Sequence, residues 1–394
     1  MSNVGNEFLN IPQELKLLLE LVTIEDNDDL EKLENLNDRT NWDLFLELAF
    51  HHRLFPVLHY RLKKLNRMLI PESVMQAIFK EYKLNTFRMM HLCAQMEQIS
   101  KVFHEASIPA LFLKGPNLAK ELYGDISLRT SSDIDILIPL DRLEEVDQML
   151  MEDGFEKEEE IKSVLNDWKW RTHHIEYKHV KKNIKLEIHW RLHPGPAHNL
   201  DFHELWSRKV KSTITSQPVF LLGKEDLFIY LAMHGARHGW FRLRWLLDIH
   251  QMLELEKVDW ELTLRLAKEY SNPYVCGQAI VLSSRLFQTK IPPEMEFVGQ
   301  LTQSKTLAQK ATYYFESMKN PHLEPIPLEM SIYNKKYMFS LLSKKQKIIT
   351  LLSYFYPYPE DVQQLQLPKA FRFLYFPLRP LLWAWRKTRK RTIY

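Results

Sequence analysis

The 394-residue sequence is poor in cysteine and glycine, and these shortages exclude several kinds of site. Its 2 cysteines, Cys93 and Cys276, are too few and too far apart for a disulfide framework or a cysteine zinc site. With only 10 glycines, a long glycine-rich phosphate loop is not expected. The low cysteine content fits a reducing compartment and favours a cytoplasmic protein.

Long hydrophobic runs are also missing. No segment reaches the roughly 18–20 consecutive apolar residues that a membrane-spanning helix needs, so no transmembrane segment is expected. Residues 1–16 lack the charged start and apolar centre of a signal peptide. Both absences add to the expectation of a cytoplasmic protein.

Charge is present in near balance but unevenly placed. Charged residues are 26% and hydrophobic residues 45% of the chain, which is typical of globular proteins. The net charge is only +3, yet no Asp or Glu follows Asp361 while Lys and Arg continue to the end. The C-terminal segment is therefore basic, and the rest of the chain is slightly acidic.

Apolar spacing divides the chain into helical, mixed and helical parts. Helical periodicity fills the first hundred residues, with a long helix predicted from Pro71 to about Ala106. Runs of strand length follow at 108–113, 132–138, 172–180 and 183–190, with a hairpin turn at 181–183 and helices at 117–123 and 142–152. Helices are predicted again at 225–238, 240–255, 260–270, 274–287, 301–318 and 341–354.

These elements predict an α+β fold in which a small mixed β-sheet is flanked by N-terminal and C-terminal helical regions. The expected units are an N-terminal helical region (1–107), an α/β core (108–192), a C-terminal helical domain (193–360) and a basic aromatic tail (361–394).

Three carboxylates in the α/β core are the strongest candidates for chemistry. Asp133 and Asp135 are two residues apart on a predicted strand, so their side chains project from the same face. Glu187 lies on another predicted strand, with Leu186 and Ile188 facing the other way. Carboxylates held together repel each other, and a divalent cation relieves that repulsion. We therefore expect Asp133, Asp135 and Glu187 to bind Mg²⁺ or Mn²⁺.

An ordinary structural explanation competes with this one. Asp-x-Asp pairs are common on exposed strand faces, and Arg129 could neutralise the pair as a simple ion-pair partner. The apolar residues around the pair indicate a buried strand, where unpaired charge is costly. Lys114 and Gly115 end one strand and open a helix, so backbone N–H groups there could approach a phosphate, although most glycines in such a place only turn the chain.

The order of these motifs resembles the nucleotidyltransferase superfamily of the DNA polymerase β type. More closely, the chain resembles a bacterial nucleotidyltransferase family of mostly uncharacterised members, over about residues 85–260. The resemblance is carried by Leu113-Lys-Gly115, Leu122-Tyr-Gly-Asp125, Arg129, Ser132-Asp-Ile-Asp-Ile-Leu-Ile138, the helix that ends at Gly154, Leu186-Glu-Ile-His-Trp190, and His234, His238, Trp240 and Asp248 in the 226–248 segment. It departs from the superfamily in having Lys114-Gly115 instead of Gly-Ser, and Glu187 where Asp is common.

This resemblance implies an enzyme that transfers NMP from an NTP such as ATP to an acceptor hydroxyl or phosphate and releases pyrophosphate. Asp133 and Asp135 would bind Mg²⁺ and nucleotide, and Glu187 would assist the metal and act as a general base. Lys114 and the N–H groups near Gly115 would hold the triphosphate, and Arg129 would neutralise the leaving pyrophosphate. The family association implies that the acceptor is a peptide or a saccharide in a biosynthetic cluster. The alternatives are a toxin-like transferase for tRNA or protein, and a catalytically silent nucleotide-binding module.

Histidines and the tail leave further alternatives open. His234 and His238 have helical i, i+4 spacing, which suits zinc, the lining of a nucleotide or acceptor pocket, or simple packing. His189 follows Glu187 on the same face and would touch substrate or orient a carboxylate. His173 and His174 read as surface or loop residues. The tail from Phe371 to Tyr394 mixes aromatic residues with cations, so it would contact an anionic membrane or RNA, or pack on the protein body.

Overall fold

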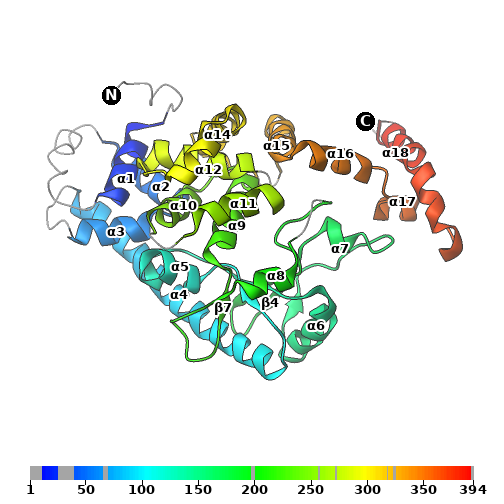
Figure 1. Cartoon of the computed structure of the whole chain (residues 1–394), viewed down its shortest axis with the longest axis horizontal. Coiled ribbons are helices and arrows are strands. Elements are labelled where there is room, and N and C mark those ends of the chain that lie inside the picture. Colours follow the sequence, from blue (N-terminus) through cyan, green and yellow to red (C-terminus); the bar gives the residue numbers. More distant parts are fainter. Residues whose placement is uncertain are drawn as a thin grey trace.

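The structure is a computed structural model that describes residues 11–24, 40–64, 70–196, 200–255, 258–270, 273–316, 318–322 and 325–391. It contains one mixed β-sheet with helices on both sides (Figure 1), which confirms the predicted α+β class. None of its described helices is long and apolar enough to cross a membrane.

The sheet has seven strands in the order β3-β4-β5-β2-β1-β7-β6. Their bounds are β1 Leu111–Phe112, β2 Ile134–Leu137, β3 Glu156–Lys157, β4 His174–His179, β5 Ile184–His189, β6 Val210–Lys211 and β7 Phe220–Leu221. β2 pairs with β5 and β1 with β7 in parallel, and the other pairs are antiparallel.

The predicted strands and hairpin are confirmed in the centre of the sheet. Asn183, in the turn between β4 and β5, has a φ of 49°, a left-handed conformation that asparagine tolerates better than most residues. The sequence did not predict β3, β6 and β7, since strands of two residues leave no periodicity to detect. β6 and β7 follow residue 192, so the sheet takes strands from beyond the expected core. The four domain boundaries stay a prediction.

The N-terminal helices are α1 Gln13–Thr23, α2 Trp42–His51, α3 Phe55–Lys64 and α4 Glu72–Glu105. The 34-residue helix α4 begins after Pro71, as predicted. Its buried residues Met89, Leu92 and Met96 share a core with Ile134 and Ile188 of the sheet. One face of the sheet is thus apolar and covered, and alternation along the strands directs every second side chain to the other face.

The helices after β1 are α5 Pro116–Tyr123, α6 Leu143–Glu152, α7 Trp168–Arg171, α8 Phe202–Ser207, α9 Lys224–Arg237, α10 Arg244–Glu254, α11 Trp260–Tyr270, α12 Pro273–Phe287, α13 Pro293–Gln300 and α14 Thr302–Phe315. Short 3₁₀ turns are η3 Ile126–Leu128, η4 Leu140–Arg142 and η5 Lys369–Leu374. The helix expected at 240–255 begins only at Arg244, because Gly239 and Trp240 both have positive φ and turn the chain.

A second hydrophobic core lies on the other face of the sheet. It is formed by α9 and α10 with the N-terminal helices, and it includes Leu137 of β2. β2 therefore contributes to a core on each face of the sheet.

Four helices at the end of the chain form what we call the C-terminal arm, residues 328–391. They are α15 Leu328–Leu341, α16 Lys344–Ser353, α17 Pro359–Gln364 and α18 Tyr375–Arg391, and they lead away from α14 and the rest of the helical region (Figure 1). The helix expected at 341–354 is divided at Leu342, which is extended, and α16 starts anew with a capping box at Ser343.

Candidate active site

The face of the sheet opposite α4 carries ionisable side chains in register. Asp135 on β2 is paired with Glu187 on β5, and Glu187 is paired in turn with Glu176 on β4. His189 and His174 form the next pair along β5 and β4. Three carboxylates therefore cross three adjacent strands in one row, with two imidazoles beside them.

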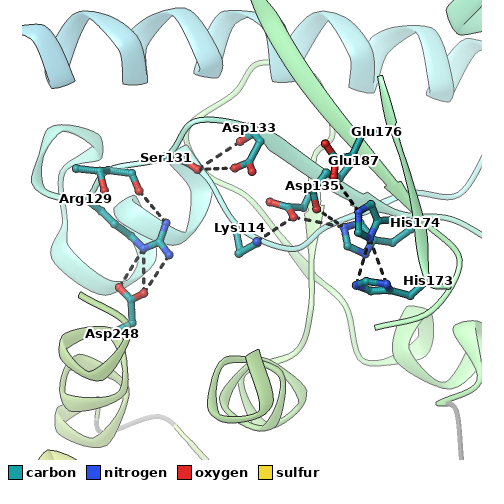
Figure 2. Close-up of polar contacts among 12 residues, drawn as sticks. Lys114, Arg129, Ser131, Asp133, Asp135, His173, His174, Glu176, Glu187 and Asp248 are labelled. Carbon is teal, nitrogen blue, oxygen red and sulfur yellow. Dashed lines mark hydrogen bonds and ion pairs between the residues drawn. The ribbon is translucent and has the colours of Figure 1, made fainter. Parts of the chain in front are cut away.

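Asp135 is the most constrained of the predicted acids. It is fully buried, with Lys114 Nζ 2.9 Å and His189 Nε2 3.3 Å from Oδ1 (Figure 2). No described group other than Lys114 and His189 donates a hydrogen bond to either carboxylate oxygen. Burial alone would raise the pKa of Asp135, but Lys114 and His189 hold that pKa below its usual range. The carboxylate is thus ionised and has lone pairs available for a cation.

Asp133 lies just before β2 and is half-buried. The hydroxyl of Ser131 is 3.4 Å from its Oδ1. Burial and the nearby charge of Asp135 raise the pKa of Asp133 to about 6. The structure thus brings the two predicted aspartates together with more negative charge than Lys114 neutralises.

The donor atoms fit a hard divalent cation. Oxygen or nitrogen atoms of Asp135, Glu187 and His189 lie within 4.8 Å of one another, and His189 Nε2 is 3.2 Å from Glu187 Oε2. Apart from the contacts of Lys114 and His189 with Oδ1, the buried oxygens of Asp135 have no hydrogen-bond partner among the described residues, so they can still accept a metal ion. Carboxylate oxygens from two parallel strands suit Mg²⁺ or Mn²⁺, which complete their coordination with water and phosphate.

A cavity of about 420 Å³ opens over these acids and is lined on its other side by cations. Besides Arg129, the cations are Arg53, Arg88, Lys114, Arg237, Arg242 and Arg244. Arg53, Arg237 and Arg242 make no ion pair with a carboxylate in the described part of the chain. Burial lowers the pKa of both Arg237 and Arg242, which reflects the cost of holding unpaired cations away from water. An anionic ligand would remove that cost.

Arg129 is not the partner of the aspartate pair. Its guanidinium donates to both oxygens of Asp248 on α10 at 3.0–3.1 Å, and both residues are buried. Figure 2 shows Arg129 turned toward Asp248 and away from Asp133 and Asp135. Asp248 also accepts a hydrogen bond of 2.8 Å from Tyr123. Arg129 thus holds the loop before β2 at the cavity wall, and its role toward pyrophosphate stays a prediction.

Lys114 and Gly115 have different positions at the site. Lys114 lines the cavity, whereas Gly115 does not. Gly115 has a φ of 90° and a ψ of −148° at the start of α5, a conformation open to glycine and strained for other residues. This geometry explains why a glycine stands at the turn after Lys114, between β1 and α5. Contact between a phosphate and the nearby N–H groups stays a prediction.

His234 and His238 line the cavity from α9, and burial lowers the pKa of both well below the usual value. His238 packs on Trp245 with ring centroids 5.0 Å apart, and its Nδ1 lies 2.7 Å from His322 Nε2. Neither histidine belongs to a group of potential metal ligands among the described residues. Their geometry therefore favours the pocket-lining alternative over zinc.

Sequence reasoning missed several residues of the cavity. His173 and His174 line it together with Glu176, although the sequence suggested surface or loop positions for these histidines. The predicted hairpin could have indicated these positions, because a turn at 181–183 places His174 opposite His189 and Glu176 opposite Glu187. No comparable signal existed for Arg237, Arg242, Arg244 or His322, which reach the cavity through the packing of helices.

A family model described as "Uncharacterised nucleotidyltransferase" matches residues 38–288, more than half of the chain. The chain belongs to this nucleotidyltransferase family. No curated protein and no solved structure matches it. The family match contains all the predicted acids and both cavity helices, α9 and α10, whereas His322 and the C-terminal arm lie beyond it.

Proposed function

We propose that the protein transfers an NMP group from an NTP to an acceptor hydroxyl or phosphate in a reaction that depends on Mg²⁺ or Mn²⁺. The observation that carries this proposal is the division of one cavity between the carboxylates Asp133, Glu176 and Glu187 and a set of cations that includes Arg53, Arg237 and Arg242. A metal–triphosphate complex has the complementary charges, with the ion toward Asp133, Asp135 and Glu187 and the phosphates toward the arginines. The glycine turn, the Asp-x-Asp strand and an acid on the parallel neighbour support membership of the polymerase β-type superfamily.

The residues of the site would have distinct roles in this reaction. Asp133, Asp135 and Glu187 would hold a divalent ion, which when bound would supply polarisation of the reacting phosphate and neutralisation of its charge. Glu187 would also accept the proton of an acceptor hydroxyl. The acceptor oxygen forms a bond to the α-phosphorus as the bond to pyrophosphate breaks. Arg237 and Arg242 then stabilise the negative charge that develops on the pyrophosphate.

The direct test is pyrophosphate release from each labelled NTP with Mg²⁺ or Mn²⁺, in the wild type and in Asp133→Ala/Asp135→Ala. Glu294→Gln, an exposed acid on α13, serves as the matched control. We expect loss in the double variant only. Equal release from the wild type and the double variant would exclude catalysis at this site. Nucleotide binding without release under any condition would favour a silent binding module.

We propose a peptide or a saccharide as the acceptor, with tRNA or protein as the toxin-like alternative. Incubation of the enzyme with an NTP and each class of acceptor, followed by mass measurement, distinguishes them by an added NMP mass. A modified tRNA with unmodified peptides and saccharides would select the alternative.

We further propose that the enzyme works in the cytoplasm at an anionic membrane surface, which the C-terminal arm contacts. Large apolar side chains project into solvent from three parts of the arm: Leu352 on α16 is 63% exposed, Phe373 in η5 61% and Leu381 on α18 66%. Ile348, Leu352 and Phe355 follow helical spacing on one face, and the exposed Lys344 and Lys345 precede them. Exposed apolar groups with adjacent cations and few acids match the chemistry of anionic lipid headgroups and the acyl region beneath them.

The arm is nevertheless a folded element. Asp361 is buried and forms ion pairs with Arg379 and Arg386. Tyr356 donates a hydrogen bond of 2.8 Å to the Leu165 carbonyl and thereby attaches the arm to the protein body. Its apolar groups are therefore exposed on a fixed surface, which favours a membrane over RNA because RNA contact does not require so many aliphatic side chains.

Sedimentation of the full chain with phosphatidylcholine vesicles, with and without phosphatidylserine, tests the arm. We expect binding only to the anionic vesicles, and a loss of roughly 10-fold or more in affinity for Leu381→Ala/Trp383→Ala. Phe297→Ala, an equally exposed side chain on α13, is the control. Binding to single-stranded RNA without vesicle binding would overturn the membrane assignment in favour of RNA.

A further inference from the structure

Three histidines form a cluster at the β4–β5 side of the cavity, and His189 is the one whose Nε2 also faces the carboxylates Asp135 and Glu187. Nitrogen atoms of His173, His174 and His189 lie within 4.8 Å of one another. All three side chains line the cavity, and the rings of His173 and His174 are close to His189, with centroids 5.4 and 4.9 Å away. We propose that these histidines bind a first-row transition-metal ion of the Zn²⁺ or Co²⁺ class, beside the carboxylate site.

His189 provides an independent observation. It is only 3% exposed, and its Nδ1 has no hydrogen-bond partner among the described residues. Its Nε2 faces Asp135 Oδ1 at 3.3 Å and Glu187 Oε2 at 3.2 Å. A histidine that ligates a metal commonly donates its other N–H to a carboxylate, which fixes the tautomer and makes the ligating nitrogen more basic. His189 already has the carboxylate half of that arrangement.

His173 and His174 supply the remaining ligands. Nδ1 of His174 lies within hydrogen-bond distance of both ring nitrogens of His173, at 3.2 Å, and a bound ion would replace this contact (Figure 2). Zn–N bonds of about 2.0–2.1 Å in a tetrahedral site hold their nitrogens about 3.3 Å apart. The first pair of nitrogens is therefore already at ligand spacing, and small side-chain rotations bring in the third.

The ligand type selects the class of ion. Imidazole nitrogen favours Zn²⁺, Co²⁺ and Ni²⁺, whereas Mg²⁺ favours oxygen, so two neighbouring sites of different chemistry exist on one sheet face. Three protein ligands leave the fourth tetrahedral position for water or an oxygen of the substrate, as in catalytic rather than structural zinc sites. Contact between that position and the acceptor rests on the proposed function, but binding of the ion does not.

Titration of the metal-free full chain with Co²⁺, followed by visible absorption, tests the proposal. We expect one equivalent to give the intense bands of a tetrahedral site. His173→Ala/His174→Ala should weaken binding more than the roughly 10–100-fold that loss of an outer partner costs. His203→Ala, an exposed histidine on α8, should leave the titration unchanged. His173→Gln replaces the double variant if circular dichroism shows that the latter is unfolded.

Asp133→Asn separates this proposal from the proposed function. We expect it to abolish transfer yet keep the tetrahedral Co²⁺ spectrum, because Asp133 is not among the three ligands. A Co²⁺ spectrum that survives the histidine variants and disappears in Asp133→Asn would place the ion on the carboxylates and overturn the histidine site. Absence of tetrahedral bands in the wild type would overturn it too, whether or not transfer occurs.

Discussion

The cavity and the C-terminal arm reverse the usual distribution of side chains in opposite ways. At the cavity, Asp135 is fully buried and the Lys114 side chain is largely so, and on the arm apolar groups such as Leu381 and Leu352 are exposed. Both arrangements are unfavourable in the isolated chain. Each would become favourable with a complementary ligand, ions and phosphates in the first case and an apolar layer in the second, and for this reason we propose functions for these two regions.

The largest effect should come from removing the buried carboxylate. Asp135→Asn keeps the size of the side chain but removes the charge that binds the cation, so we expect transfer to fall by roughly 1,000-fold or more. Steady-state kinetics with saturating NTP measures this. A decrease below tenfold would contradict the importance of charge at this position, and Glu294→Gln provides the reference.

The next effect concerns the buried ion pair beside the cavity. Asp248→Ala leaves the guanidinium of Arg129 buried without its carboxylate, which should lower the free energy of unfolding by about 3–5 kcal/mol. Urea denaturation measures the change. Lys101→Ala removes an exposed pair with Glu105 and should cost only about 0–1 kcal/mol. Similar losses in both variants would show that burial does not distinguish the two pairs.

A pH effect of intermediate size should arise from Asp133. Its pKa is raised to about 6, so between about pH 4 and pH 6 the folded state binds more protons than the unfolded state. Stability of the metal-free protein should therefore decrease by about 1–3 kcal/mol as pH rises through this window. Thermal unfolding in chelator measures it. Asp133→Asn should flatten the decrease, and a decrease unchanged in that variant would assign it to another group.

The smallest effect should be on the stability of the arm. Leu381→Ala/Trp383→Ala changes side chains that already contact solvent, so the free energy of unfolding should change by about 0.5 kcal/mol or less. Urea denaturation in the absence of vesicles measures it. A loss of several kcal/mol would mean that these side chains pack inside the protein, and the contrast with the cavity would then disappear.

Local patterns in the sequence predicted those parts of the site that strands carry. The two-residue spacing of Asp133 and Asp135 fixes their common face, and the β4–β5 hairpin fixes the neighbours of Glu187. The cations could not be predicted in this way, because Arg237 and Arg244 enter the cavity through the crossing of α9 and α10. The ion pair of Arg129 could not be predicted for the same reason, since its partner Asp248 lies 119 residues away on a helix whose position depends on tertiary packing.

The contact between Lys114 and Asp135 has a thermodynamic consequence for the order in which ligands bind. The ammonium group lies 2.9 Å from the carboxylate that a divalent ion would use, so a bare ion must compete with it. An ion that arrives with a triphosphate also brings phosphate oxygens, and the ammonium group of Lys114 can pair with these in place of the carboxylate. Metal and nucleotide should therefore increase each other's affinity by the same factor, and Lys114 would act as the counterion that holds the site until both are present.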